Sequence, residues 1–181
     1  EKVKLNSKKD LLIYSYRVAG SVGLMMAKIL NVKDHNALKS AIDLGIAMQL
    51  TNISRDVVED AQNNRYYIAS NFNEIKNTLK LADLFYESSF ASIKEIPINF
   101  RFSILVARRV YRKIGHNILK KKSFVSYSNA GKIYVTNISK INQTILSIFD
   151  LIKISLIETG DHLRDKEHLL IKEEINLNER F

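Results

Sequence analysis

The sequence contains no cysteine, one proline and six glycines among its 181 residues. Without cysteine the chain has no disulfide framework and no thiol chemistry, which fits a reducing cytoplasm. The scarcity of proline and glycine leaves few breaks between regular elements. No alternation of apolar and polar residues competes with the helical periods. The sequence therefore predicts an all-α fold.

Long apolar runs are also absent. The longest ones fall well short of the ~20 residues that a helix needs to span a bilayer, and the first residues show no signal-peptide pattern. Any membrane contact is therefore expected to be peripheral. The length suits one domain with a buried core, which we place at residues 1–157, followed by a charged tail at residues 158–181.

The net charge of +9 is unevenly distributed. From Glu158 onward seven acidic residues outnumber four basic ones, so this segment carries −3 and the preceding residues carry +12. A basic body attracts nucleic acid, anionic lipid or diphosphate. The basic residues are dispersed and form no recognition motif for nucleic acid, so no nucleic-acid partner is expected.

The most informative stretch lies inside a helical pattern that we expect over about residues 34–61. At about 100° per residue, one polar line runs along this helix, while apolar residues occupy more than one other side. The pattern predicts a mostly buried helix, whose polar line must find hydrogen-bond partners or face a wet cavity. The polar line consists of Gly45, Gln49, Asn52, Asp56 and Asp60.

Two carboxylates and an amide follow one another at nearly one-turn spacing in this line. Neighbours at such spacing lie about 6 Å apart, and oxygen ligands of this kind suit Mg²⁺, which usually takes one or two carboxylates plus phosphate oxygens. Alternatively, Asp56 and Asp60 are solvated acids that pair with Arg55. The flanking Gln49 and Asn52 and the apolar surroundings favour the metal site.

Four segments together resemble the squalene/phytoene synthase family. Residues 49–61, with Asn64-Arg65-Tyr66-Tyr67, resemble its second aspartate-rich motif, and residues 14–26 (YSYRVAGSVGLMM) resemble its Tyr-Cys-Tyr-x-Val-Ala-Gly-x-Val-Gly element in a wording nearest to phytoene synthases. Residues 107–115 and 132–140 are similar to two later family segments. The resemblance extends over about residues 11–141.

This resemblance implies the helical bundle of the isoprenoid synthases. The family also has an upstream half with a first Asp-x-x-x-Asp motif on a facing helix. We therefore expect the chain to be the carboxy-terminal portion of a longer enzyme, with the N-terminal helices missing, and to be inactive alone. The implied activity is that of a prenyl transferase of carotenoid biosynthesis, a phytoene synthase. Such an enzyme joins two geranylgeranyl diphosphates head to head through prephytoene diphosphate, with Mg²⁺, or alternatively Mn²⁺, as cofactor.

The resemblance also implies roles for individual residues. It assigns metal binding to Asn52, Asp56 and Asp60, and catalysis to Asp56, Asp60 and Tyr14, whose hydroxyl would lie near the diphosphate. It assigns substrate binding to Tyr14, Val18, Ala19, Gly23, Gln49, Asn52, Arg55, Arg65, Tyr111, Lys132 and Lys140. Plainer alternatives stay open: Ala19 and Gly23 as a helix-packing seam, Arg65 as an ordinary loop cation, and Tyr111 as a buried tyrosine bonded to any acceptor.

Two other functions are considered. A squalene or dehydrosqualene synthase would use farnesyl diphosphate, with NADPH dependence marking the squalene reaction, and a non-catalytic family member would act as an assembly factor. Prenyl diphosphate is the expected partner, and a cytoplasmic location at the membrane surface follows from the lipid-like substrate and product. Further helices are expected over about residues 10–30, 73–96, 99–120 and from Lys132, with the arginines of residues 99–120 mostly on a solvated face.

Overall fold

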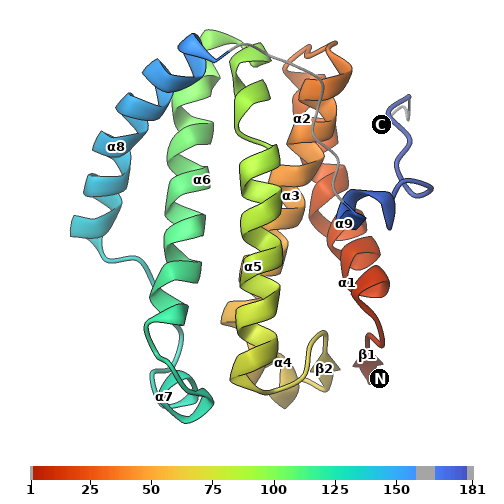
Figure 1. Cartoon of the computed structure of the whole chain (residues 1–181), viewed down its shortest axis with the longest axis vertical. Coiled ribbons are helices and arrows are strands. Elements are labelled where there is room, and N and C mark those ends of the chain that lie inside the picture. The colour runs from red at the N-terminus through yellow and green to blue at the C-terminus, as the bar shows by residue number, and fades with distance from the viewer. Residues whose placement is uncertain (1, 158–165, 179–181) are drawn as a thin grey trace.

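The computed structural model describes residues 2–157 and 166–178, and nearly all of their regular structure is helical, which confirms the all-α prediction (Figure 1). Long helices lie side by side along the long axis of the molecule, with α5 in front of α3 in this view. The α-helices are α1 (Lys8–Ser15), α2 (Ser21–Ile29), α3 (His35–Arg55), α4 (Val57–Gln62), α5 (Phe72–Ser88), α6 (Ile98–Leu119), α7 (Phe124–Ser128), α8 (Asn137–Leu156) and α9 (Lys166–Leu169).

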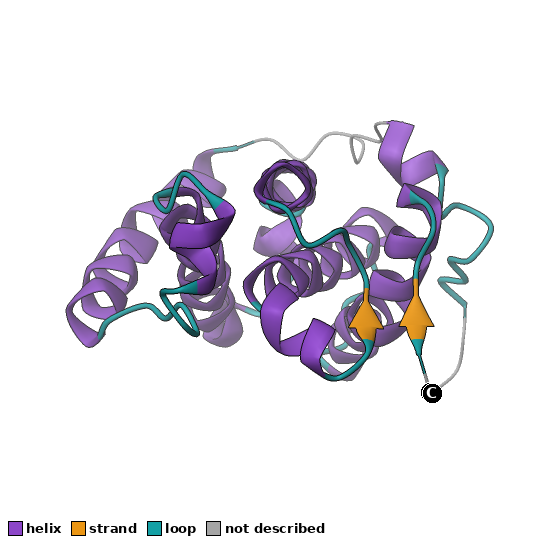
Figure 2. Ribbon diagram, turned by 90° about the horizontal axis from the view of Figure 1, so that it is seen from below, coloured by secondary structure: helices purple, strands orange, loops and turns teal. Residues whose placement is uncertain are grey.

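Two short strands are the exception to the all-helical prediction. β1 (Val3–Lys4) and β2 (Arg65–Tyr66) pair in parallel (Figure 2), with Val3 opposite Arg65. The pairing ties the loop after α4 to the beginning of the chain. Strands of two residues leave no alternation of apolar and polar residues in the sequence, so the pattern could not reveal them.

Helix α3 lies at the centre of the molecule and packs against α2, α5 and α6. Asp34 caps it, because the carboxylate accepts a hydrogen bond from the amide of Ala37 at 2.7 Å. Its apolar residues are buried on several sides, as the sequence predicted, and the fully buried ones include Ile42, Ile46 and Leu50.

The long helix expected over residues 34–61 is interrupted at Asp56. The residue has φ −105° and ψ 13°, and α4 starts directly after it. The hydroxyl of Tyr127 in α7 donates to the carbonyl of Arg55 at 2.7 Å and accepts from the amide of Val57 at 3.2 Å. These two bonds satisfy backbone groups at the interruption, so a residue far along the chain stabilises the bend.

The helix expected over residues 10–30 is also divided. A π-helical turn, η1 (Tyr16–Gly20), separates α1 from α2. Such turns insert one extra residue into the helical repeat and often occur at functional sites. The inserted residue changes which side chains of α1 and α2 share a face, and a simple 3.6-residue period does not predict this change.

Three further element boundaries differ from the predictions. α5 is capped by Asn71 instead of Asn73 and ends at Ser88, after which a 3₁₀ turn, η2 (Ala91–Glu95), leads to Pro97. Helix α8 begins at Asn137, after the capping Thr136, and not at Lys132. The loop expected after Lys120 contains the short helix α7.

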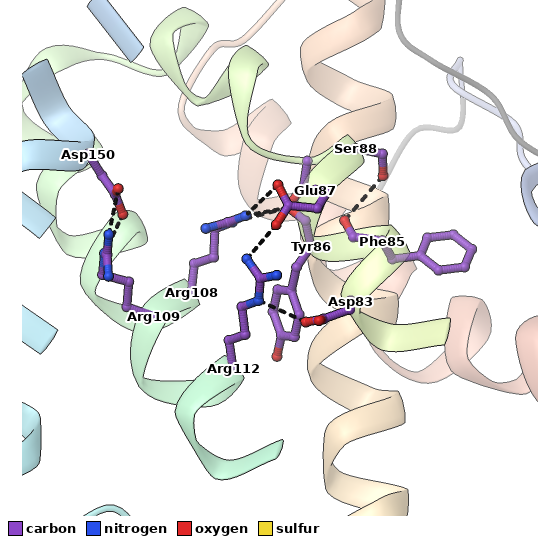
Figure 3. A network of polar contacts seen from close by, with 10 residues as sticks. Asp83, Phe85, Tyr86, Glu87, Ser88, Arg108, Arg109, Arg112 and Asp150 are labelled. Atoms are coloured by element: carbon purple, nitrogen blue, oxygen red, sulfur yellow. Dashed lines mark hydrogen bonds and ion pairs between the residues drawn. The ribbon is translucent and has the colours of Figure 1, made fainter. Parts of the chain in front are cut away.

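The arginines of α6 do not form the solvated face that the sequence predicted. Arg108 is buried, and Arg109 and Arg112 are partly buried in ion pairs with Asp150 and Asp83 (Figure 3). The acidic partners of Arg109 and Arg112 come from α8 and α5. Those partners could not be predicted from α6 alone.

Residues 166–178 pack against the helical body. The ring of His168 is buried, and its Nε2 lies 3.0 Å from a carboxylate oxygen of Asp43 in α3. Ile171 is also buried in the main core. Residues 158–165 lie outside the described part, so the proposed boundary at residue 157 stays a prediction.

Helix α8 packs on α6 with one face and exposes an apolar outer face. Within the described ranges, no helix is long and apolar enough to cross a membrane. The exposed outer face consists of Ile138, Ile141, Ile145, Ile148, Phe149, Ile152 and Leu156.

Candidate functional site

An apolar cavity of about 490 Å³ lies between α2, α3, η2 and α6. Its volume falls in the range typical of small-molecule sites. The α3 wall runs from Ala37 to Asn52, and the next residue of the same polar line is Asp56. The structure thus brings together six of the predicted substrate-binding residues on this cavity: Val18, Ala19, Gly23, Gln49, Asn52 and Tyr111.

Gly23 has a packing role in addition to its place on the cavity wall. A Cβ atom on Gly23 would lie 2.2 Å from the carbonyl oxygen of Ala41, and one on Gly45 would lie 2.3 Å from that of Ala19. Both glycines therefore allow the backbones of η1–α2 and α3 to approach closely. The packing seam and the cavity wall, which the sequence presented as alternatives, coincide here.

Asp56 is held by two basic side chains. Arg55 donates to both of its carboxylate oxygens, at 2.8 and 2.6 Å, and Lys132 Nζ lies 3.7 Å away. The same lysine nitrogen donates to Glu59 at 2.9 Å. These side chains line a second cavity of about 240 Å³. Three of the predicted site residues, Arg55, Asp56 and Lys132, therefore lie close together.

Asp60 has a different environment. Burial, with a smaller contribution from the Asp56 carboxylate, raises the pKa of Asp60, and the charge of Arg65 partly offsets this increase. Among the described residues, no side chain forms a hydrogen bond or ion pair with the Asp60 carboxylate. Asp60 is therefore an oxygen ligand that no cation of residues 2–157 or 166–178 neutralises by direct contact.

The amide oxygen of Asn52 is buried and has no hydrogen-bond partner in the described part of the chain. An unsatisfied buried oxygen is unfavourable, and a metal ion would relieve this. In the described ranges, no three His, Cys, Asp or Glu residues converge on a possible metal position. Asn52, Asp56 and Asp60 supply oxygen ligands of the type that suits Mg²⁺, for which phosphate oxygens and water would complete the shell.

Tyr14 lies in α1 beside the loop that follows α4. Its hydroxyl donates to that of Tyr67 at 3.0 Å, and the two rings stack with centroids 4.7 Å apart. Burial and the bond to Tyr67 raise the pKa of Tyr14 to about 12. At neutral pH the hydroxyl therefore stays protonated and is able to donate a hydrogen bond.

Two predicted phosphate ligands are less directly placed. Arg65 is exposed in β2, although its charge acts on both Tyr14 and Asp60. Lys140 is exposed on the first turn of α8, and no contact within the described residues joins it to the carboxylates. The contribution of Lys140 to this site stays a prediction.

Sequence reasoning missed Tyr127 and gave Tyr67 no role. Tyr67 belongs to the residues that resemble the second aspartate-rich motif, so its place in that motif was a usable signal. Tyr127 lies in the segment expected to be a loop and reaches Arg55 and Val57 only through the tertiary fold. No local pattern indicates that contact.

Comparison with known proteins supports the sequence resemblance. Residues 1–75 match the family model described as squalene/phytoene synthase. The chain is 37% identical to a 15-cis-phytoene synthase of a Paracoccus species, covering 68% of this chain and 48% of that protein. It is 38% identical to a 15-cis-phytoene synthase of Enterobacter agglomerans, covering 63% and 46% respectively. The chain thus spans about half the length of these relatives.

A solved structure supports the fold. The crystal structure of a dehydrosqualene synthase in complex with a ligand superposes with a TM-score of 0.70 at 30% sequence identity. The superposition covers 84% of this chain and 60% of the other. The expected helical fold of the isoprenoid synthases is confirmed.

Proposed function

Because this chain belongs to the squalene/phytoene synthase family, we propose that it forms the part of a phytoene synthase that carries the second aspartate-rich motif. The proposed enzyme joins two geranylgeranyl diphosphates head to head in carotenoid biosynthesis. The activity is proposed for the complete protein that contains these residues, since the chain spans about half the length of these relatives.

The observation that supports this proposal is the order of groups along α3 and α4. α3 lines the apolar cavity as far as Asn52, Asp56 follows at the bend after α3, and Asp60 follows in α4. An amphipathic substrate with a prenyl chain and a diphosphate would find apolar walls and then oxygen and cationic groups in that order. The apolar walls would also keep water from a carbocation.

The residues have complementary roles in this proposal. Asn52, Asp56 and Asp60 would hold Mg²⁺, which when bound neutralises diphosphate and makes it a better leaving group. Arg55 and Lys132 lie beside Asp56 and would contact phosphate oxygens. The protonated Tyr14 would donate a hydrogen bond near the same group once its hydroxyl turns away from Tyr67.

Product analysis of the complete protein tests this function. The enzyme would be incubated with Mg²⁺ and either geranylgeranyl or farnesyl diphosphate, with and without NADPH. A forty-carbon hydrocarbon formed without NADPH is the expected result. A thirty-carbon product as the main product would contradict the phytoene synthase proposal.

A dehydrosqualene or squalene synthase is the second candidate, because the solved relative at TM-score 0.70 is a dehydrosqualene synthase. The same assay separates the two by chain length, and NADPH dependence would mark the squalene reaction. The variant Asp56→Ala distinguishes either synthase from a non-catalytic assembly factor. We expect it to lower turnover at least about 10²-fold, while Glu173→Gln, an exposed acid in the C-terminal segment, leaves turnover unchanged.

We also propose that the complete protein works at the cytoplasmic membrane surface, because a prenyl substrate and a hydrocarbon product partition into lipid. Flotation with lipid vesicles tests this location. Recovery of the protein only in the vesicle-free fraction would contradict it.

A further inference from the structure

A second polar cleft lies between α5, α6 and α8, on a different face of α6 from the apolar cavity. Its volume is about 210 Å³, and it shares no lining residue with the apolar cavity. Two carboxylates, Glu87 and Asp150, also line it. Five cationic side chains line the cleft: Arg108, Arg109, Arg112, Lys113 and Lys153.

The two carboxylates of the cleft are already engaged. Arg109 donates through two nitrogens to Asp150, one of them at 2.7 Å. Arg112 Nη1 lies 2.5 Å from Glu87, and its Nε donates to Asp83 at 2.8 Å (Figure 3). The acids therefore neutralise Arg109 and Arg112 and leave the other three cations without a carboxylate within hydrogen-bond distance in the described ranges.

Arg108 is the most buried of these cations. Its residue is only 5% exposed, and its Nε and Nη2 both donate to one acceptor, the carbonyl oxygen of Tyr86, at 3.1 and 2.8 Å. The one carboxylate within 4 Å in the described ranges is that of Glu87, at 3.9 Å. Burial lowers the pKa of Arg108. A buried guanidinium with donors to spare is unfavourable unless an anion approaches it.

The other two cations complete the lining. Lys153 Nζ and Arg108 Cζ lie 5.4 and 4.7 Å from the centroid of the Phe90 ring. This ring holds an α6 cation and an α8 cation on the same cleft. Neither Lys113 nor Lys153 forms an ion pair with a described residue. Cations held together in this way repel one another in the absence of an anion.

We propose that this cleft binds a small phosphate-class anion, either free phosphate or diphosphate or the phosphate headgroup of a lipid. Arg108 would donate from the buried end, and Lys113 and Lys153 would donate from α6 and α8. The cleft has less than half the volume of the apolar cavity, so it accommodates a headgroup and not a prenyl chain. This site is independent of the proposed synthase activity.

Calorimetric titration of the 181-residue chain with inorganic phosphate and with diphosphate tests the proposal. The titrations are run without divalent metal, at constant ionic strength, with chloride as the reference anion. We expect saturable binding that weakens about tenfold in Lys153→Gln and is unchanged in Lys76→Gln, a matched exposed lysine of α5.

Arg108→Gln should abolish binding, but its loss of contact with Tyr86 could impair folding. Lys153 is exposed, so Lys153→Gln should fold normally. It therefore tests the proposal even where Arg108→Gln does not fold. Flotation with vesicles of phosphatidylcholine, with or without phosphatidic acid, distinguishes a lipid headgroup from a free anion as the ligand. Flotation that requires phosphatidic acid and is competed by phosphate identifies a lipid headgroup, whereas binding of free anion alone identifies a soluble ligand. Equal affinities in Lys153→Gln and Lys76→Gln, or no heat beyond the chloride reference up to millimolar phosphate, would overturn the proposal.

Discussion

Asp56 and Asp60 lie four residues apart on one polar line, yet their surroundings differ. Arg55 and Lys132 neutralise Asp56, whereas the partly buried carboxylate of Asp60 is only partly compensated, by the more distant charge of Arg65. Burial of a charged oxygen without a partner lowers stability. The carboxylate of Asp60 is therefore suited to binding a cation, and it lowers the stability of the metal-free fold.

We predict that Asp60→Asn stabilises the metal-free chain against urea at neutral pH. The folded pKa of Asp60 is raised, so the unfolded chain ionises first as the pH rises, and wild type loses stability between the ordinary aspartate value and the raised one. The gain should be below about 1 kcal/mol, because partial exposure screens the charge. Urea unfolding in EDTA measures it.

The pH dependence provides the control for Asp60→Asn. Below the ordinary aspartate pKa both states of wild type are protonated at this position, so the difference between variant and wild type should disappear on acidification. A lower stability of Asp60→Asn at neutral pH would contradict this account of Asp60.

At the scale of elements, the close crossing of α2 and α3 depends on glycine. We predict that Gly23→Ala destabilises the fold by about 1–3 kcal/mol or more, because its Cβ would lie 2.2 Å from the backbone oxygen of Ala41. Backbone atoms cannot move aside as a side chain does. Thermal or urea unfolding of the two proteins measures the loss.

Gly115→Ala is the matched control, since Gly115 also lies inside a helix. Its Cβ would meet only Leu79 Cδ2, at 3.1 Å, which is the end of a flexible side chain. The higher helix propensity of alanine, worth about 1 kcal/mol, offsets that contact. Equal losses for Gly23→Ala and Gly115→Ala would show that the crossing does not depend on glycine.

The same elements show how far a sequence predicts structure. The burial of α3 followed from a local pattern, because the helical period is a short-range property. The bend at Asp56 depends on Tyr127, and the burial of Arg108 depends on the carbonyl of Tyr86. Both partners are distant in sequence, so a helix wheel assigned Arg108 to solvent and extended the helix through Asp56.

For the site, sequence predicted which residues share a face but not which of them pair. Val18, Gln49 and Tyr111 do lie on one cavity, as the family resemblance implied. The ion pairs of Lys132 with Asp56 and Glu59 join α4 to the segment before α8. Lys140, taken from the same resemblance, is not brought to the carboxylates by any contact in the described ranges.

At the scale of the whole molecule, the described residues build one side of the proposed reaction centre. The polar line of α3 and α4 supplies two carboxylates and one amide oxygen, and in the described ranges no third carboxylate or histidine joins them. Two diphosphate-bearing substrates would need more cationic charge than one Mg²⁺ on this face provides. The chain matches 60% of the solved relative, so the relative has further residues to contribute.

We therefore predict that the purified 181-residue chain does not turn over geranylgeranyl or farnesyl diphosphate, although it folds. The oxygen ligands on one face would position the metal and one diphosphate. The second substrate would lack an opposing face that holds it against the first. Holding two substrates against each other supplies much of an enzyme's rate acceleration, so this chain alone would lose it. Release of diphosphate and formation of hydrocarbon are measured side by side for this chain and for the complete protein. Circular dichroism confirms that the shorter chain is helical, and hydrocarbon formed by it at the rate of the complete protein would show that this half is a sufficient catalyst.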